Sequence, residues 1–578
     1  MRPFPAPVRE ARALAILGLP LIGGHMAQIA MHITDTVMLG WYSVEALAAV
    51  VLGATTFFVL FIVGSGFAWA VMPMVAAANA NGDAVEVRRT TRMALWLSLI
   101  YGAAVLPLLW FSGPLLRAMG QDDALAAAAE GYLRIAGWGI FPALIVMVLK
   151  SYLAALERTG VVLWATVAGA VLNALLNWAL IFGNWGAPEL GVTGAAIATL
   201  ATQLLTLALT AGYAALHPAL RRYTLFIRFW RPDWGAFAAV FRLGWPIGLT
   251  SLAESGLFAA SALMMGWVGT HELAAHGIAL EIVSLIFMIH VGLANAATIR
   301  AGQAHGLGDT AGLRLVAATG LALVLGIALL AVVLFLVAPG PLIGLFLAPG
   351  DPARPAILAI GATLLAVAAL FQLADAGQVM ALGLLRGVQD TRVPMIYASV
   401  SYWLVGIPAS YVLGFTLGWG GPGIWAGLAI GLALAFTLLV WRFRSRVGAA
   451  RPCPPKPRWR RRRPRRRLAR ARTEDPDAAR HRPLRRRHAC SRHRHPGPGR
   501  AERPARRPHR LARRGRDGAV RGGLPRRRGR PGPDRRPGGA RAAAGAAGAP
   551  VPGRASGRLL RAVDHLDRAP LRRRQRGL

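Results

Sequence analysis

The chain has 578 residues, of which 55% are hydrophobic, and a formal net charge of +40. Such an apolar composition excludes an ordinary soluble protein of this size, whereas so high a charge is unusual for a membrane protein. The two properties separate along the sequence. Residues 1–448 contain 23 Lys or Arg and 18 Asp or Glu, and the remaining residues contain 43 basic and 8 acidic side chains. An apolar region and a basic tail therefore need separate interpretations.

Twelve apolar segments follow one another in the first region. A bilayer core of about 30 Å requires roughly 20 apolar residues per helix, and each segment reaches that length. No cleavable signal peptide is expected, because the first segment runs on into polar residues without a small-residue cleavage pattern. The sequence predicts an all-α integral membrane protein with helices at 13–37, 46–76, 93–112, 131–155, 161–183, 191–215, 239–267, 277–299, 313–347, 356–385, 394–417 and 422–441.

Arginine is distributed unevenly between the two sets of short connections. Because Lys and Arg accumulate in cytoplasmic loops, the richer side is assigned to the cytoplasm, and both termini lie there. The opposite side carries few basic residues beyond Arg117 and Arg354. The richer side carries Arg2, Arg9, Arg12, Arg88, Arg89, Arg92, Arg158, Arg221, Arg222, Arg228, Arg231, Arg300, Arg314, Arg386 and Arg392.

The two halves of the apolar region repeat each other at an offset of 226 residues. Because each repeat has an even number of spans, both insert the same way round, and an axis along the membrane normal relates them. We therefore predict two pseudo-symmetric six-helix bundles, residues 1–220 and 221–448, with a site between them. The matching pairs include Met38/Met264, Gly40/Gly266, Trp41/Trp267, Gly66/Gly292, Gly82/Gly308, Asp83/Asp309 and Arg88/Arg314.

The Arg/Pro-rich tail, residues 449–578, has no hydrophobic period and is expected to be disordered. It contains a single lysine, Lys456, beside dozens of arginines, and it holds both cysteines, Cys453 and Cys490. This composition favours a GC-rich gene translated in the wrong frame over a genuine interaction tail. A basic tail that is translated is expected to bind anionic lipid or nucleic acid without specificity.

Three carboxylates fall inside predicted spans: Asp35, Glu254 and Asp375. Ionisable residues at membrane depth are costly and mark ion or substrate pathways. A carboxylate in apolar surroundings binds either a proton or a cation, and competition between the two is the simplest chemical basis of exchange. These three residues are the candidate ion-coupling and substrate-binding groups, with Na⁺ a possible ligand of Glu254 and Asp375. No catalytic residue or resident metal site is predicted.

Further polar and aromatic side chains share helix faces with these carboxylates. His25, Gln28, His32 and Asp35 form a stripe along the first helix, which must face a cavity or another helix. For His25 and His32 taken singly, hydrogen bonds between helices are the favoured explanation. Asn173 and Asn177 are either cavity residues or such interhelical contacts. The cavity-lining candidates are Gln28, His32, Asn173, Asn177, Phe371, Gln372 and Gln378.

Four stretches carry a resemblance to a known family. They read TDTVMLGWYSVEALAAV at 34–50, LNALLNWALIFGNWGAPELGVTG at 172–194, LGWPIGLTSLAESGLFAASALMMG at 243–266 and, at 373–414, LADAGQVMALGLLRGVQDTRVPMIYASVSYWLVGIPASYVLG. Residues 8–445 resemble the MATE (multidrug and toxic compound extrusion) family, in its NorM-like branch. Nothing in the tail belongs to that pattern.

The resemblance implies a secondary active antiporter of the bacterial cytoplasmic (inner) membrane. Two lobes would rock by alternating access, exporting small organic, often cationic, compounds in exchange for inward H⁺ or Na⁺. Asp35 stands at the family's N-lobe site, and Glu254 and Asp375 at its C-lobe site. Phe371 stands where sodium-coupled members often have a tyrosine, and this departure favours protons. No cofactor beyond the coupling ion and no specific nucleic-acid partner are expected. The protein is expected to be a monomer.

Two alternatives remain. A lipid-linked precursor flippase of the same superfamily would carry a cavity rich in Arg and Lys, whereas here Lys150 and Arg134 are the cations near membrane depth. A membrane-tethered nucleic-acid-binding protein acting through the tail would require that the tail is translated. An enzyme is not expected, because the sequence contains no nucleophile triad, phosphate loop or metal cluster.

Overall fold

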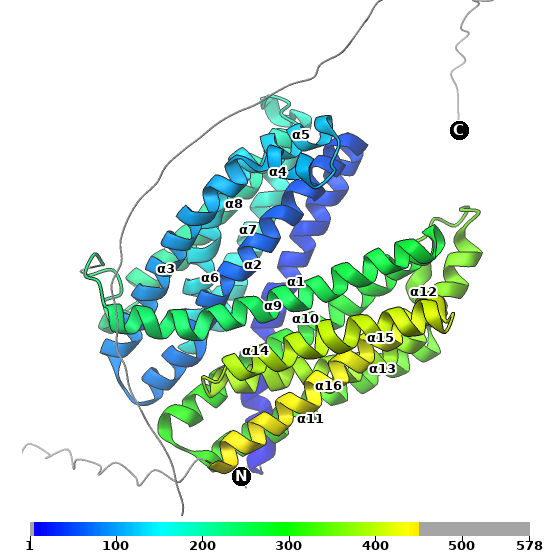
Figure 1. Cartoon of the computed structure of the whole chain (residues 1–578). Coiled ribbons are helices and arrows are strands. Elements are labelled where there is room, and N and C mark those ends of the chain that lie inside the picture. Colours follow the sequence, from blue (N-terminus) through cyan, green and yellow to red (C-terminus); the bar gives the residue numbers. More distant parts are fainter. Residues whose placement is uncertain (1–4, 228, 450–578) are drawn as a thin grey trace, which may run out of the picture. The chain divides into compact units, whose positions relative to one another are not determined.

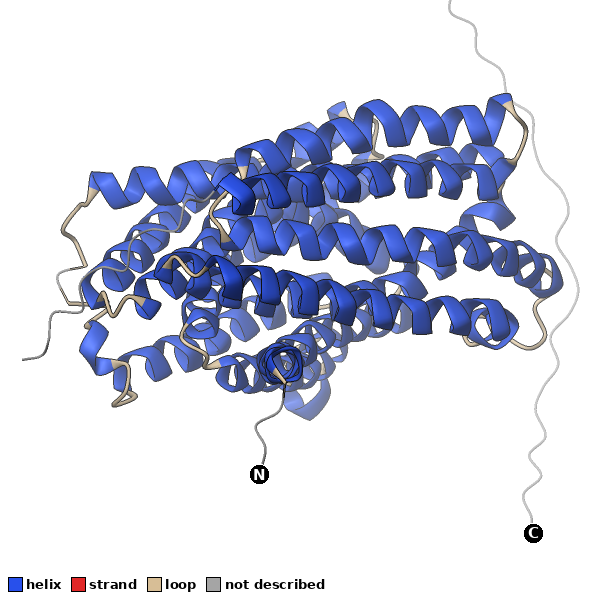
Figure 2. Cartoon of the chain, turned by 90° about the horizontal axis from the view of Figure 1, so that it is seen from below, coloured by secondary structure: helices blue, strands red, loops and turns tan. Residues whose placement is uncertain are grey.

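The computed structural model describes residues 5–227 and 229–449, and these residues form helices without a strand (Figure 2). Twelve helical segments are long and apolar enough to cross a membrane, as the sequence predicts. The first six, with their short flanking helices, are called the N-lobe here and the last six the C-lobe. Most of the predicted tail, from residue 450 onward, lies outside the described residues, as do Arg2 and Arg228.

The N-lobe begins with two long helices, α1 (Ala6–Tyr42) and α2 (Val44–Ala80). Ser43 separates them, and its side chain accepts a hydrogen bond from the Ala46 amide, which caps the start of α2. The fourth span combines α5, η1 and α6. The remaining N-lobe elements are α3 (Ala84–Trp110), α4 (Ser112–Ala118), α5 (Asp123–Ala136), η1 (Gly137–Gly139), α6 (Ile140–Ala155), α7 (Thr159–Phe182), η2 (Asn184–Gly186) and α8 (Val192–Leu216).

The short 3₁₀ helix η3 (Arg221–Tyr223) lies in the connection to the C-lobe. In that lobe the eleventh span alternates between α-helix and π-helix: α14 (Arg392–Ser399), η4 (Val400–Gly406), α15 (Ile407–Tyr411) and η5 (Val412–Thr416), where η4 and η5 are π-helices. The other elements of the C-lobe are α9 (Trp234–Val268), α10 (Thr270–Leu307), α11 (Thr310–Val337), α12 (Pro339–Gly344), α13 (Arg354–Gly387) and α16 (Gly420–Ala449).

One predicted span is too long. The segment expected at 313–347 ends as α11 at Val337, and the separate short helix α12 follows from Pro339. Pro339 and Pro341 lack the amide hydrogen that would continue the helix, so the chain turns there although its composition stays apolar.

The repeat predicted from the sequence has structural counterparts. Gly82 and Gly308 both adopt a positive φ, of 73° and 70°. The side chains of the next residues, Asp83 and Asp309, accept hydrogen bonds from the first-turn amides of α3 and α11. Both halves thus have, at the same place, a glycine in the left-handed conformation followed by an aspartate that caps the next helix.

The lobes meet at one end of their helices and diverge toward α5 and α12 (Figure 1). The shared end carries the Arg-bearing connections and is called the arginine-rich end here. Glycines allow the close approach: a Cβ on Gly66 of α2 would lie 2.4 Å from the Gly248 nitrogen of α9. A Cβ on Gly292 of α10, the repeat partner of Gly66, would lie 3.0 Å from the Ile22 nitrogen of α1. Small residues thus let helix backbones of the two lobes touch.

Candidate substrate and ion site

The C-lobe carboxylates lie on two neighbouring elements, Glu254 on α9 and Asp375 on α13. Phe371, Asp375 and Gln378 are spaced by four and three residues, so the helical period places them on one face of α13. Gln378 connects the elements: its Nε2 donates to Glu254 Oε1 at 2.7 Å, and its Oε1 accepts from the Tyr402 hydroxyl at 2.6 Å. The structure therefore brings Glu254, Asp375 and Gln378 together; that they form a C-lobe site stays a prediction.

Asp375 is the group with the fewest polar contacts in this cluster. Asp375 is 1% exposed, and neither oxygen of its carboxylate has a hydrogen-bond partner among the described residues. The Glu254 carboxylate lies within electrostatic reach of it. A buried ionised carboxylate without a partner is strongly unfavourable, so this geometry suits a protonated acid or a carboxylate holding a cation.

Two aromatic rings cover the same face. The Phe371 ring packs edge-on against Phe258, with ring centroids 6.0 Å apart, and against Trp425 at 5.4 Å. The Trp425 indole donates to His276 Nδ1 at 3.0 Å, which fixes its orientation. Phe371 therefore fills the wall of the cluster with hydrocarbon and offers no oxygen to an ion.

Sequence reasoning missed Tyr402 and His290. Tyr402 is fully buried on the π-helix η4, and π-helices gather at functional sites, but no local residue pattern announces one. The Nδ1 atom of His290, on α10, lies 3.4 Å from the side-chain amide nitrogen of Gln372. Gln372 Oε1 and His290 Nε2 have no hydrogen-bond partner in the described part of the chain.

The N-lobe cluster joins α1 and α7. Asn177 donates from its Nδ2 to Asp35 Oδ1 and to Asn173 Oδ1, the latter at 3.2 Å. Both asparagines are 0% exposed, whereas Asp35 is partly exposed. The pairing explains the spacing of Asn173 and Asn177, which lie one turn apart and face the same carboxylate. These amides therefore act both as interhelical contacts and as partners of a candidate site residue.

The polar stripe of α1 divides between two environments. His25 and Gln28 line a cavity of about 40 Å³, which also contains Lys150 of α6 and Asn295 of α10. The Asn295 amide nitrogen lies 3.5 Å from His25 Nε2, so this part of the stripe faces the other lobe. His32 is exposed, and its side chain makes no hydrogen bond to another described residue.

The cations at membrane depth differ from those expected. Arg134 pairs with Glu130 one turn earlier on α5, at 2.9 Å, so it is no free cavity charge. Arg386, which sequence reasoning placed in a connection, lies in the last turn of α13. Its guanidinium carbon sits 5.2 Å from the ring centroid of Trp69 on α2, and Glu254 lies within its electrostatic reach. Trp69 also lines the cavity that contains Lys150.

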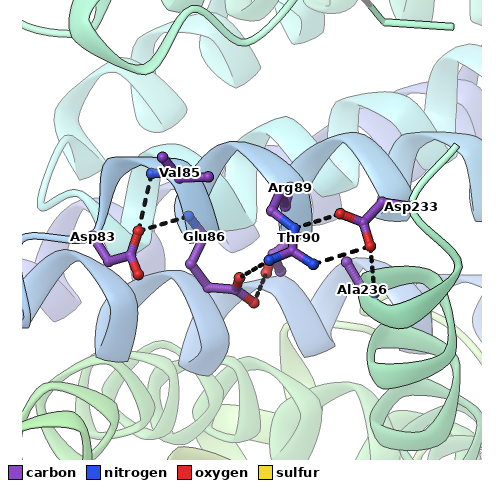
Figure 3. A network of polar contacts seen from close by, with 7 residues as sticks. All are labelled: Asp83, Val85, Glu86, Arg89, Thr90, Asp233 and Ala236. Atoms are coloured by element: carbon purple, nitrogen blue, oxygen red, sulfur yellow. Dashed lines mark hydrogen bonds and ion pairs between the residues drawn. The ribbon is translucent and has the colours of Figure 1, made fainter. Parts of the chain in front are cut away.

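Polar contacts join the lobes at the arginine-rich end. The Arg300 guanidinium of α10 donates two hydrogen bonds to Glu10 of α1, at 2.8 and 2.7 Å. The Arg89 guanidinium of α3 contacts both carboxylate oxygens of Asp233, which precedes α9 (Figure 3). This hydrogen bond and charge lower the pKa of the Asp233 carboxyl below its ordinary value. Paired guanidinium–carboxylate contacts of this kind fix orientation as well as adding energy.

Comparison with known proteins decides the family. The MatE family profile matches residues 20–179 and 246–412, one match in each lobe. The chain belongs to the MATE family. A protein from Rhizobium meliloti, "Probable multidrug resistance protein NorM", is 49% identical over 432 residues, which are 75% of this chain and 92% of the relative. A protein of the same description from Agrobacterium fabrum is 43% identical and covers 75% of this chain and 93% of its own length.

Solved MATE structures share the fold. One described as "Outward-facing conformation of a multidrug resistance MATE family transporter of the MOP superfamily" superposes with a TM-score of 0.70 at 22% identity, covering 77% of this chain and 97% of its own. "Crystal structure of MATE in the straight conformation" gives 0.70 at 21% identity, covering 76% and 97%. Twelve spans and bacterial relatives make this MATE protein a multi-pass transporter of the bacterial inner membrane.

Proposed function

We propose that this MATE protein is a secondary active antiporter that exports small organic, often cationic, compounds in exchange for inward protons. The observation that carries the proposal is Asp375, a fully buried carboxyl without a hydrogen-bond partner in the described residues, next to the carboxylate of Glu254. A proton neutralises such a group at low cost. When the proton leaves, the site regains a negative charge that attracts a cationic compound.

Sodium fits the same cluster less well. A dehydrated Na⁺ needs several oxygen ligands, and Phe371 supplies none. The Tyr402 hydroxyl and the Gln378 carbonyl, which lie close by, are bonded to each other at 2.6 Å. A proton needs no coordination shell, so these features favour it as the coupling ion.

The arrangement of the lobes supports exchange by alternating access. They touch at the arginine-rich end, which we assign to the cytoplasm, and diverge at the other end. In this state the clusters would face the outside, where protons enter and the compound leaves. Rocking of the lobes would then separate Arg89 from Asp233 and Arg300 from Glu10, opening the path from the cytoplasm.

The test is efflux of a fluorescent cationic dye from proteoliposomes that contain the full chain. We expect dye efflux when a pH difference between lumen and bath is imposed in buffers that contain potassium and no sodium. A sodium gradient at equal pH should add no efflux. Efflux that follows sodium and ignores the pH difference would overturn the proton assignment. No gradient-dependent efflux in either arm would overturn the antiporter itself.

A further inference from the structure

A second pocket, with a volume of about 680 Å³, lies at the arginine-rich end of the C-lobe. It shares no lining residue with the two carboxylate clusters. Its walls come from α9, the connection between α13 and α14, the start of α14, and α16, with one side chain from α2 of the N-lobe. The residues that matter for the argument are Met74, Arg242, Asp390, Thr391, Arg392 and Arg446.

The pocket has a large excess of positive charge. Its one lining carboxylate, Asp390, is already bonded by Arg446 at 2.7 Å and by Arg442 at 2.8 Å. Arg242 and Arg392 are exposed. Their side chains form no ion pair or hydrogen bond with any residue in 5–227 or 229–449. Three arginines and one aspartate therefore line the pocket, a fourth arginine, Arg442, bonds that aspartate, and the side chains of Arg242 and Arg392 have no protein acceptor among those residues.

Backbone donors add to this charge. Thr391 precedes the first residue of α14, where a threonine hydroxyl commonly accepts a hydrogen bond from the first turn of a helix. Here the hydroxyl instead donates to the Leu243 carbonyl at 3.0 Å, and no side chain caps α14. The amides of Arg392 and Val393 thus have no side-chain cap, while Pro394 has no amide hydrogen, and a helix start favours a negative charge.

Aromatic residues show the depth at which the pocket lies. Trp441 of α16 is 60% exposed and stacks on Tyr397 of α14, with ring centroids 6.4 Å apart. Trp234, at the start of α9, is 71% exposed. Exposed tryptophan and tyrosine gather at the headgroup level of a membrane. Arg446 lies just over one turn beyond Trp441 toward the helix end, so the pocket opens at headgroup depth.

We propose that this pocket binds the phosphodiester headgroup of an anionic phospholipid. The planar guanidinium fork matches phosphate oxygens, and basic pockets between membrane helices hold such headgroups. Arg242 and Arg392 contact the phosphate, while Arg442 and Arg446 are held in place by Asp390. The basic tail, with 43 basic and 8 acidic residues, has the same sign of charge and is therefore no counterpart for the pocket.

The test uses the full chain in phosphatidylcholine nanodiscs doped with a photoactivatable phosphatidylglycerol probe, followed by mass-spectrometric mapping of crosslinks. Only crosslinks on α9, α14 and α16 are counted, because the arginines of a translated tail also attract the probe. The variants are Arg242→Gln, Arg392→Gln and the double variant. Arg444→Gln is the matched control, since Arg444 is an exposed arginine at the same end of α16 that does not line the pocket.

We expect labelling of these helices to fall about fivefold for each arginine removed, because one basic residue near a membrane surface is worth about 1 kcal/mol. Arg444→Gln should leave it unchanged, and a phosphatidylcholine probe should label the site weakly. Equal loss in Arg444→Gln, or undiminished labelling in the double variant, would overturn the proposal. Displacement of the probe by inorganic phosphate would assign the pocket to a soluble anion and refute a lipid ligand.

Discussion

In the N-lobe, Asp35 is partly exposed and accepts a hydrogen bond from Asn177, which also bonds Asn173. In the C-lobe, Asp375 is buried without a hydrogen-bond partner among the described residues, and its charged neighbour is another carboxylate, Glu254. Amide donors stabilise an ionised acid, whereas burial beside a like charge favours a neutral one. Under the proposal above, the two lobes therefore have different roles: the C-lobe carboxyls exchange the proton, and Asp35, held by amide donors, attracts the cationic compound.

The largest expected effect follows from removing the exchangeable groups. Glu254→Gln and Asp375→Asn should each abolish the coupling between proton and compound, which for linked binding sites is typically about 5–150-fold in affinity. Both variants should insert normally, because a neutral amide costs less than a charge in the membrane interior. The measurement is drug resistance of cells at matched expression, checked by purified protein yield.

A matched control for this prediction is Glu281→Gln. Glu281 belongs to α10 of the same lobe, and its carboxylate bonds only the hydroxyl of Ser284 one turn later among the described residues. It should retain full resistance. Resistance that survives in Glu254→Gln or Asp375→Asn would show that the C-lobe cluster is not the coupling site.

A smaller, more selective effect is expected from Asp35→Asn. The substitution keeps the shape of the side chain but removes the charge held by Asn177. A monovalent cationic dye should therefore bind roughly 10- to 150-fold more weakly, which corresponds to about 1.5–3 kcal/mol for a charged hydrogen bond. Binding of an uncharged compound should stay the same, and binding should still depend on pH. Loss of the pH dependence would mean that the N-lobe carries the titrating group and that the two lobes have been assigned the wrong way round.

Gly66→Ala tests whether the lobes must touch at the arginine-rich end. The new Cβ would lie 2.4 Å from the Gly248 nitrogen, and overpacking of this kind costs about 1–3 kcal/mol, so the contact should open. Its readout is crosslinking by a bifunctional thiol reagent between cysteines placed at Asn81 and Leu307. The Asn81 side-chain nitrogen lies 2.9 Å from the carbonyl oxygen of Gly306, and the neighbouring Leu307 is 62% exposed, so a cysteine there does not enter the glycine contact. Cys453 and Cys490 are first replaced by serine, which leaves no other cysteine.

We expect crosslinking to fall about fivefold in Gly66→Ala. This corresponds to a shift of about 1 kcal/mol in the equilibrium between touching and separated helices. Gly24→Ala is the control, because a Cβ at Gly24 would meet nothing within 4 Å. Unchanged crosslinking in Gly66→Ala would mean that the glycine contact does not hold this end closed.

The smallest effect is expected at Arg89 and Asp233. Their side chains are 38% and 24% exposed, so the pair should stabilise the closed end by less than about 1 kcal/mol. Arg89 holds the pKa of Asp233 below its ordinary value. The contribution is therefore present above the ordinary pKa and lost only as the pH falls through the lowered pKa. The Asn81–Leu307 crosslink of Arg89→Gln should match the parent protein to within a few fold from about pH 5 to pH 8. A steep change in that range would place a titrating group in the lobe contact.

Much of the fold is predictable because a bilayer imposes length and polarity on each helix. Twelve spans and the matching glycine–aspartate pairs at 82–83 and 308–309 follow from residues visible in the sequence, whereas the contact of Asp35 with Asn177 of α7 does not. The predicted end of the ninth span was wrong, since hydropathy alone ignores what Pro339 does to the backbone after α11.

The C-lobe site was only partly predictable. Gln378 and Asp375 share a helix face with Phe371 and are found from the helical period. Tyr402 and His290 join them from other elements, and their contribution depends on a π-helix and on packing between α10 and α13. Arg386 looks like a loop residue in the sequence, whereas the last turn of α13 carries it to Trp69. Contacts between helices, not local patterns, decide these roles.

The central claim is that proton and compound compete for the C-lobe carboxylates, and proton release on binding measures it directly. A cationic compound is added to the purified full chain in weakly buffered detergent solution with a pH-sensitive dye. We predict a stoichiometric release of protons in the parent protein and in Asp35→Asn at saturating compound, and a loss of release in the Glu254→Gln, Asp375→Asn double variant. Binding without proton release in the parent protein, or release that persists in the double variant, would contradict the account.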